Sequence, residues 1–156
     1  FMSKDYIKFI KDIHHYINQP LNFINPKDSK YYDIVKNQKR YGTYPVARLD
    51  DIEIFFMHYV SKEQAKAKWN RRVKRIDWDH ILYKFNDQNG CSMNEIEEFI
   101  ALPVKNKICF TVHKEYLKAP YIKLIKAPKS HQEIRASYEP FGKSKYVNVN
   151  DLINSL

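Results

Sequence analysis

Five consecutive segments between residues 52 and 112 decide the fold, because they alternate between two kinds of hydrophobic pattern. They read IEIFFMH (52–58), SKEQAKAKWNRRVKR (61–75), HILYKF (80–85), SMNEIEEFI (92–100) and KICFTV (107–112). The first, third and fifth segments are short apolar runs, which are typical of buried strands. The second and fourth space their apolar residues three and four positions apart, which predicts helices. Strand–helix–strand–helix–strand order with short connections predicts βαβ units.

The boundaries of these helices are marked by local signals. Ser61-Lys62-Glu63-Gln64 and Ser92-Met93-Asn94-Glu95 have the spacing of capping boxes, and Pro103 stops the second helix. A further strand is expected at 121–126, although the link after Val112 looks too short for a crossover helix. We therefore expect a three-layer α/β/α fold, with a mostly parallel or mixed sheet, in a single domain spanning residues 1–156.

The flanking segments are less regular. Ser3 is the expected N-cap of a helix that continues to Ile17, and residues 25–45 are predicted to form a loop. A short strand is expected at 46–49. The end of the chain predicts a strand at 146–149 and a last helical turn at 151–156, capped by Asn150.

Composition narrows the class of protein. The chain has 156 residues, 44% of them hydrophobic, and a net charge of +9 from 27 basic and 18 acidic residues, so it is neither disordered nor membrane-spanning. Three glycines are too few for a glycine-rich phosphate loop. Two cysteines make neither a disulfide framework nor a zinc site, and no signal peptide is visible, so a cytoplasmic location is expected.

Polar residues follow the predicted strands at the edge where parallel α/β sheets bind ligands. His58 and Tyr59 follow the first strand, Asn86 and Asp87 follow the second, and Thr111 and His113 follow the third. We predict that His58 acts as a base or phosphate ligand and that Asp87 orients a hydroxyl or helps to hold a cation, as catalytic residues. Tyr59 and Thr111 are expected to contact substrate, and the helix start at Ser61 provides amide donors for an anion.

A second cluster lies late in the helix 61–75, where Arg72 and Arg75 are predicted to bind an anionic substrate. No metal site is expected, because no cluster of His, Cys and Asp has ligand spacing, and the cofactor stays unknown. Each candidate also has a purely structural interpretation. His58 can be a strand-end histidine, Asp87 can belong to a turn, and the arginines can stabilise the end of the helix.

Most of the chain resembles a bacterial family known as domain of unknown function 1919. The matching pieces are Asp5-Tyr6-Ile7-Lys8-Phe9, Tyr44-Pro45, Leu49-x-Asp51-Ile52-x-Ile54, His58-Tyr59-x-Ser61-x-Glu63-x-Ala65-x-x-Lys68-Trp69-x-Arg71-Arg72-x-x-Arg75-Ile76, Asn89-Gly90-Cys91 and Leu102-Pro103-x-Lys105-Asn106-Lys107-Ile108-Cys109-Phe110-Thr111. The resemblance implies a role in exopolysaccharide or capsule biosynthesis, in which sugar donors are mostly nucleotide diphosphates. The family's usual N-terminal segment, with a Ser-Asn-Asn-Cys-Trp-Gly-Gly-like motif, is not found in this sequence. The chain is therefore expected to be a fragment that lacks an upstream segment.

Three possible functions follow from these observations. The first is an enzyme of surface polysaccharide biosynthesis that binds a sugar-phosphate or nucleotide-sugar and transfers a group, with peripheral association to membrane-bound polysaccharide machinery. The alternative is a non-catalytic basic module that binds an acidic glycan, an anionic membrane or nucleic acid. Sequence-specific nucleic-acid binding is not expected, because no recognised reading module appears. A third possibility is a structural partner of an upstream catalytic portion.

Overall fold

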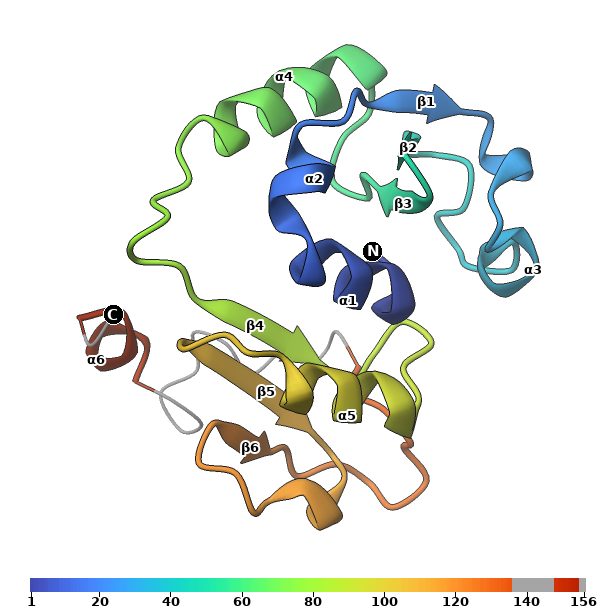
Figure 1. Ribbon diagram of the computed structural model, residues 1–156. Coiled ribbons are helices and arrows are strands. Elements are labelled where there is room, and N and C mark those ends of the chain that lie inside the picture. Colours follow the sequence, from blue (N-terminus) through green and yellow to red (C-terminus); the bar gives the residue numbers. More distant parts are fainter. Residues whose placement is uncertain (136–147, 155–156) are drawn as a thin grey trace. The chain divides into compact units, whose positions relative to one another are not determined.

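The chain folds into two compact units, each with its own sheet and its own hydrophobic core (Figure 1). The computed structural model describes residues 1–135 and 148–154. Unit 1 comprises Phe1–Ile76 and unit 2 comprises Asp77–Leu156.

Unit 1 combines short helices with a small sheet. Its elements are α1 (Ser3–Lys11), α2 (Ile13–Ile17), β1 (Asn22–Ile24), the 3-10 helix η1 (Pro26–Asp28), α3 (Tyr32–Val35), β2 (Val46–Leu49), β3 (Ile52–Phe55) and α4 (Lys62–Val73). The predicted N-terminal helix is divided at Asp12, whose backbone leaves the helical region and whose side chain caps α2. Ser3 lies inside the first turn of α1, and Met2 is the N-cap. The predicted loop 25–45 contains η1 and α3.

The sheet of unit 1 is antiparallel, in the order β1-β2-β3. Only Asp50 and Asp51 separate β2 from β3, and so short a connection forms a hairpin. Asp50 takes a positive φ of 53°, which an aspartate tolerates better than most residues. Ala47, Leu49, Ile52 and Ile54 face the core with Ala65 of α4, and all are buried.

The opposite face of this hairpin buries two carboxylates. Glu53 is fully buried, and it accepts hydrogen bonds from the Arg48 Nε (3.0 Å) and from the Lys30 backbone (3.2 Å). Asp5 on α1 accepts from Lys30 Nζ (2.8 Å), Tyr31 OH (2.8 Å) and the Glu53 backbone (2.7 Å). These contacts tie α1 and the segment around Lys30 to β3, as a satisfied polar network.

Unit 2 contains a parallel sheet in the order β4-β5-β6. Its elements are β4 (Tyr83–Asn86), α5 (Met93–Ala101), β5 (Lys107–Thr111), η2 (Lys114–Tyr116), β6 (Ile122–Leu124) and α6 (Val149–Asn154). The βαβ unit β4–α5–β5 confirms the prediction for this part of the chain. Ser92 and Glu95 form the predicted capping box of α5, with both reciprocal hydrogen bonds present.

The strand β6 pairs parallel with β5, which is one of the two arrangements expected, and the link between them contains no crossover helix, as predicted. To run parallel to β5, the chain must return over the length of its five residues, which is about 17 Å. The ten residues 112–121 that link the two strands are long enough to span that distance. The short 3-10 helix η2 and a turn therefore replace a crossover helix in this link. Within the predicted strand 146–149, residues 146–147 lie outside the described residues. The helix α6 begins at Val149, and Asn148, not Asn150, caps it.

The α/β class is confirmed, but the described strands form two sheets, and a three-layer arrangement is not confirmed. The expected βαβ unit across the helix α4 does not form, because β3 pairs with β2 whereas β4 pairs with β5. The single domain spanning residues 1–156 stays a prediction.

Candidate functional site

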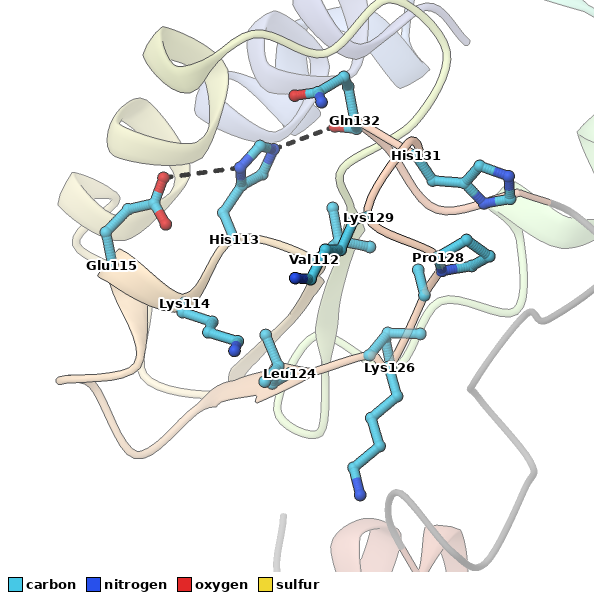
Figure 2. A pocket seen from close by; sticks show the side chains of 12 residues that line it. Val112, His113, Lys114, Glu115, Leu124, Lys126, Pro128, Lys129, His131 and Gln132 are labelled. Atoms are coloured by element: carbon cyan, nitrogen blue, oxygen red, sulfur yellow. Dashed lines mark hydrogen bonds and ion pairs between the residues drawn. The ribbon is translucent and has the colours of Figure 1, made fainter.

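A pocket of about 600 Å³ opens in unit 2 beyond the carboxyl ends of β5 and β6 (Figure 2). Val112 continues β5 into it, Leu124 ends β6, and the following segment 125–132 forms another wall. Because the two strands are parallel, their carboxyl ends meet at one edge, where ligands of α/β sheets bind. The sequence predicts a ligand site at this kind of sheet edge, beyond the carboxyl ends of parallel strands.

Basic side chains gather around this pocket. Its charged or ionisable lining consists of His113, Lys114, Glu115, Lys126, Lys129 and His131, so Glu115 is its one acidic group among the described residues. In Figure 2 the ammonium groups of Lys114 and Lys129 point into the pocket, whereas Lys126 extends outward. Apolar side chains, including Val112, Leu124 and Pro128, complete the lining. The pocket therefore suits an anionic ligand with an apolar or sugar-like part.

Asp87 lies buried behind the wall of this pocket and holds the backbone of that wall by hydrogen bonds. It follows β4, is 1% exposed, and accepts hydrogen bonds from the Thr111 hydroxyl (2.6 Å) and the Val112 backbone (2.7 Å) on Oδ2. Its Oδ1 accepts from the Ile134 backbone (2.9 Å), and the Asp87 carbonyl also accepts from that N–H (3.0 Å). The carboxylate thereby joins the ends of β4 and β5 to the segment that closes the pocket.

The pKa of Asp87 reflects two opposed effects. Burial raises the pKa of this carboxyl above its ordinary value, because the charged form loses hydration. The hydrogen bonds from Thr111, Val112 and Ile134 and the nearby His113 oppose that rise. Both carboxylate oxygens are occupied and the group is buried, so the structure supports a positioning role for Asp87. The catalytic role predicted for it stays a prediction.

His113 is the titratable side chain best placed for chemistry in the pocket. Its Nε2 lies 3.0 Å from the Gln132 carbonyl oxygen and 4.0 Å from Asp87 Oδ2. A carbonyl oxygen only accepts hydrogen bonds, so Nε2 carries a proton and Nδ1 is the basic nitrogen of the neutral ring. Nδ1 lies 3.6 Å from Glu115 Oε1 (Figure 2). The side chain is 21% exposed, so a ligand can reach it.

Thr111 and Asp87 are the two predicted site residues that the structure brings together. Thr111 is fully buried, and its hydroxyl accepts from the His113 backbone (3.0 Å) while it donates to Asp87. It therefore fixes the backbone at the pocket's edge from within the protein. Contact between Thr111 and a substrate stays a prediction.

The other predicted residues belong to unit 1. His58 is exposed in the turn after β3, and Tyr59 packs edge-on against Phe56. Ser61 is the N-cap of α4 and accepts from the Gln64 backbone (3.1 Å). Arg72 and Arg75 are exposed at the end of α4 and just beyond it.

The argument that placed His58 beside Asp87 does not hold. It required β3 and β4 to be neighbours in one parallel sheet, and they lie in different sheets and different units. The strand β3 instead pairs antiparallel with β2, because a two-residue turn joins the two strands in a hairpin. The roles predicted for these unit 1 residues remain untested predictions.

Sequence reasoning missed five ionisable pocket residues, namely Lys114, Glu115, Lys126, Lys129 and His131. One signal was available, since basic residues follow both Val112 and Ile125 where predicted strands end. The segment 125–132 has no helix or strand pattern, so its return to this edge was not visible in the sequence. Among the described residues, no group of three or more His, Cys, Asp and Glu side chains is placed to hold a metal ion.

The fold and this site define an α/β protein with a basic pocket at the carboxyl edge of a parallel sheet. The whole chain, residues 1–156, matches the family described as domain of unknown function (DUF1919), so the protein belongs to that family. It is similar to an uncharacterized protein of Haemophilus influenzae, with 36% identity over 113 residues. The match covers 72% of this chain and 48% of the relative, so the chain spans about half of that protein's length. No helix within the described ranges is long and apolar enough to span a bilayer.

Proposed function

We propose that unit 2 binds a phosphorylated sugar, as a sugar-phosphate or a nucleotide-sugar, in the pocket beyond β5 and β6. The observation that carries this proposal is the gathering of His113, Lys114, Lys126, Lys129 and His131 around one pocket with a single described carboxylate, that of Glu115. Such a lining attracts a phosphate group electrostatically and gives an uncharged competitor no comparable attraction. Its apolar wall accommodates the face of a sugar ring or base.

Each pocket residue has a distinct part in this proposal. Lys114 and Lys129 contact the phosphate, since their ammonium groups point into the pocket (Figure 2). His113 Nδ1 accepts a proton from a ligand hydroxyl, or donates one to a phosphate, because Nε2 is held by Gln132. Asp87 and Thr111 hold the backbone that presents His113.

The biological context follows from the resemblance to exopolysaccharide and capsule biosynthesis proteins. We propose that the longer protein transfers a group from a nucleotide-sugar during surface polysaccharide assembly, in the cytoplasm. The chain spans about half of its relative, so such a protein has room for further residues of a complete active site. Binding is the step that the described residues support by themselves.

The test is titration calorimetry of the chain with sugar-phosphates and nucleoside diphosphate sugars. The double variant Lys114→Glu with Lys129→Glu should weaken binding at least roughly tenfold, since a hydrogen bond to a charged group is worth about 1.5–3 kcal/mol. The matched control is Lys105→Glu with Lys118→Glu, which makes the same charge change outside the pocket lining. Equal weakening in both variants would show that net charge alone, and not the pocket, attracts the ligand.

A further inference from the structure

The helix α4 and the turn after it form a second basic surface, in unit 1. The stretch 61–75 contains one acidic residue, Glu63, and seven basic residues, which are Lys62, Lys66, Lys68, Arg71, Arg72, Lys74 and Arg75. We call these seven residues the α4 basic surface. Six of them are exposed and Lys68 is half-buried.

The charges of the α4 basic surface are not neutralised within the described part of the protein. None of the seven basic side chains forms an ion pair with a described acidic side chain. Other basic residues of unit 1 are paired, since Lys30 pairs with Asp5, Lys36 with Asp33, and Arg48 with Glu53. A surface with this excess of one charge is complementary to a polyanion.

Packing determines which side of α4 faces outward. Ala65 is buried in the core of unit 1, and Trp69 packs against Phe9 and Phe56 with ring centroids 6.3 and 6.5 Å apart. Lys68, Arg71 and Arg72 are three and four positions apart, so they share one side of α4, and Arg75 follows in the turn just after the helix. Their ammonium and guanidinium groups can therefore meet an anionic surface together.

The exposed apolar residues beside α4 distinguish between two polyanions. Met57 and Val60, in the turn before α4, are 41% and 85% exposed. Aliphatic side chains next to cations suit insertion at a lipid headgroup boundary. Binding of single-stranded nucleic acid relies on exposed aromatic rings, and the two aromatic rings within and next to α4, those of Tyr59 and Trp69, pack against the core of unit 1 instead.

We propose that the α4 basic surface docks this protein on an anionic phospholipid bilayer, with Val60 entering the headgroup region. This proposal rests on the charge and exposure of the α4 basic surface and not on the pocket of unit 2, so the failure of one proposal would leave the other intact. Each Lys or Arg held near an anionic membrane contributes roughly fivefold to partitioning. Several basic residues together with an inserted aliphatic side chain make docking reversible but specific for anionic lipid.

Co-sedimentation with vesicles of phosphatidylglycerol and phosphatidylcholine tests the proposal, with pure phosphatidylcholine vesicles as the comparison. The chain should bind the anionic vesicles, and binding should weaken as salt rises. The triple variant Arg71→Glu, Arg72→Glu, Arg75→Glu should bind at least about tenfold less. The control, Lys4→Glu with Lys27→Glu and Lys39→Glu, makes the same charge change at exposed residues outside the surface and should bind nearly as well.

A fluorescent variant tests the insertion directly. Relative to the unsubstituted chain, whose Trp69 and Trp78 give the baseline, Val60→Trp should shift the emission to shorter wavelength with anionic vesicles and not with phosphatidylcholine alone, because the added indole then leaves water. Three results would overturn the proposal. They are equal loss of binding in the arginine and lysine variants, no emission shift at saturating anionic vesicles, and arginine-dependent binding of an oligonucleotide without binding of vesicles. Thermal melting of every variant confirms that it is folded.

Discussion

Asp87 shows how one buried side chain can determine the shape of a site that it does not enter. Its carboxylate accepts three hydrogen bonds, from Thr111, Val112 and Ile134. Asp87→Ala leaves the Thr111 hydroxyl and the Val112 N–H without this acceptor, whereas the Ile134 N–H keeps the Asp87 carbonyl, so we expect a loss of about 3 kcal/mol in the free energy of unfolding. Thr111→Val removes one of the bonds and should cost about 1–2 kcal/mol. Urea unfolding measures both, and a loss below about 0.5 kcal/mol for Asp87→Ala would contradict this role.

Tyr16 makes a prediction about alkaline pH. Burial and the hydrogen bond to Asp51 (2.8 Å) raise the pKa of Tyr16 to about 12, from an ordinary value near 10. Above about pH 10 the unfolded chain loses the phenolic proton that the folded protein keeps, so the contribution of Tyr16 to stability falls as the pH rises. Tyr16→Phe should therefore be less stable than the wild type at about pH 9, and the difference should shrink by about pH 11. Urea midpoints of both proteins test this, and a difference that stays constant would contradict the raised pKa.

At the scale of elements, Lys107, the first residue of β5, stabilises the C-terminal end of the helix α5. Lys107 Nζ donates to the carbonyl oxygens of Ile100 (2.6 Å) and Leu102 (2.7 Å), and it lies 4.7 Å from the ring centre of Tyr121. Burial lowers the pKa of this ammonium group, yet its three carbonyl partners, including Phe99 (3.3 Å), satisfy its protons. A cation at the C-terminal end of a helix also interacts favourably with the negative end of the helix dipole.

Lys107→Met should lower the free energy of unfolding by about 1–3 kcal/mol, because it leaves the last carbonyls of α5 without this donor. Hydrogen exchange of the amides at the end of α5 should become faster. Lys105→Met, at an exposed position two residues earlier, is the control and should change stability by less than about 0.5 kcal/mol. Unchanged exchange in α5 would show that Lys107 does not secure this helix end.

At the scale of the whole molecule, the two hydrophobic cores raise the question of cooperativity. Ile54 lies in the core of unit 1 and Ile108 in that of unit 2. Because the two cores share no described residue, Ile54→Ala should speed hydrogen exchange in unit 1 alone, and Ile108→Ala in unit 2 alone. Each substitution should cost about 2–5 kcal/mol in its own unit. Equal acceleration in both units would instead support the single domain predicted from the sequence.

The candidate site was predictable only where neighbouring strands are also close in the sequence. Asp87 and Thr111 lie at the ends of β4 and β5, which one short helix joins, so the strand–helix–strand rule placed them together. His58 follows a strand whose partner is fixed by a two-residue hairpin, and the rule failed there. Lys129 and His131 belong to a segment without regular structure, and no periodic pattern predicts where such a segment packs.

The sequence by itself determined the local elements, namely the strands of unit 2 and the capped helices α4 and α5. It also determined the excess of positive charge. These depend on periodicity, capping residues and composition, which act over a few neighbouring positions. Only the tertiary structure decided that the strands divide into two sheets and that β6 runs parallel to β5. It also decided that His113 and the lysines near it surround one pocket. Pairing and pocket formation depend on which distant segments bury one another's apolar and polar groups, and a linear pattern does not record that choice.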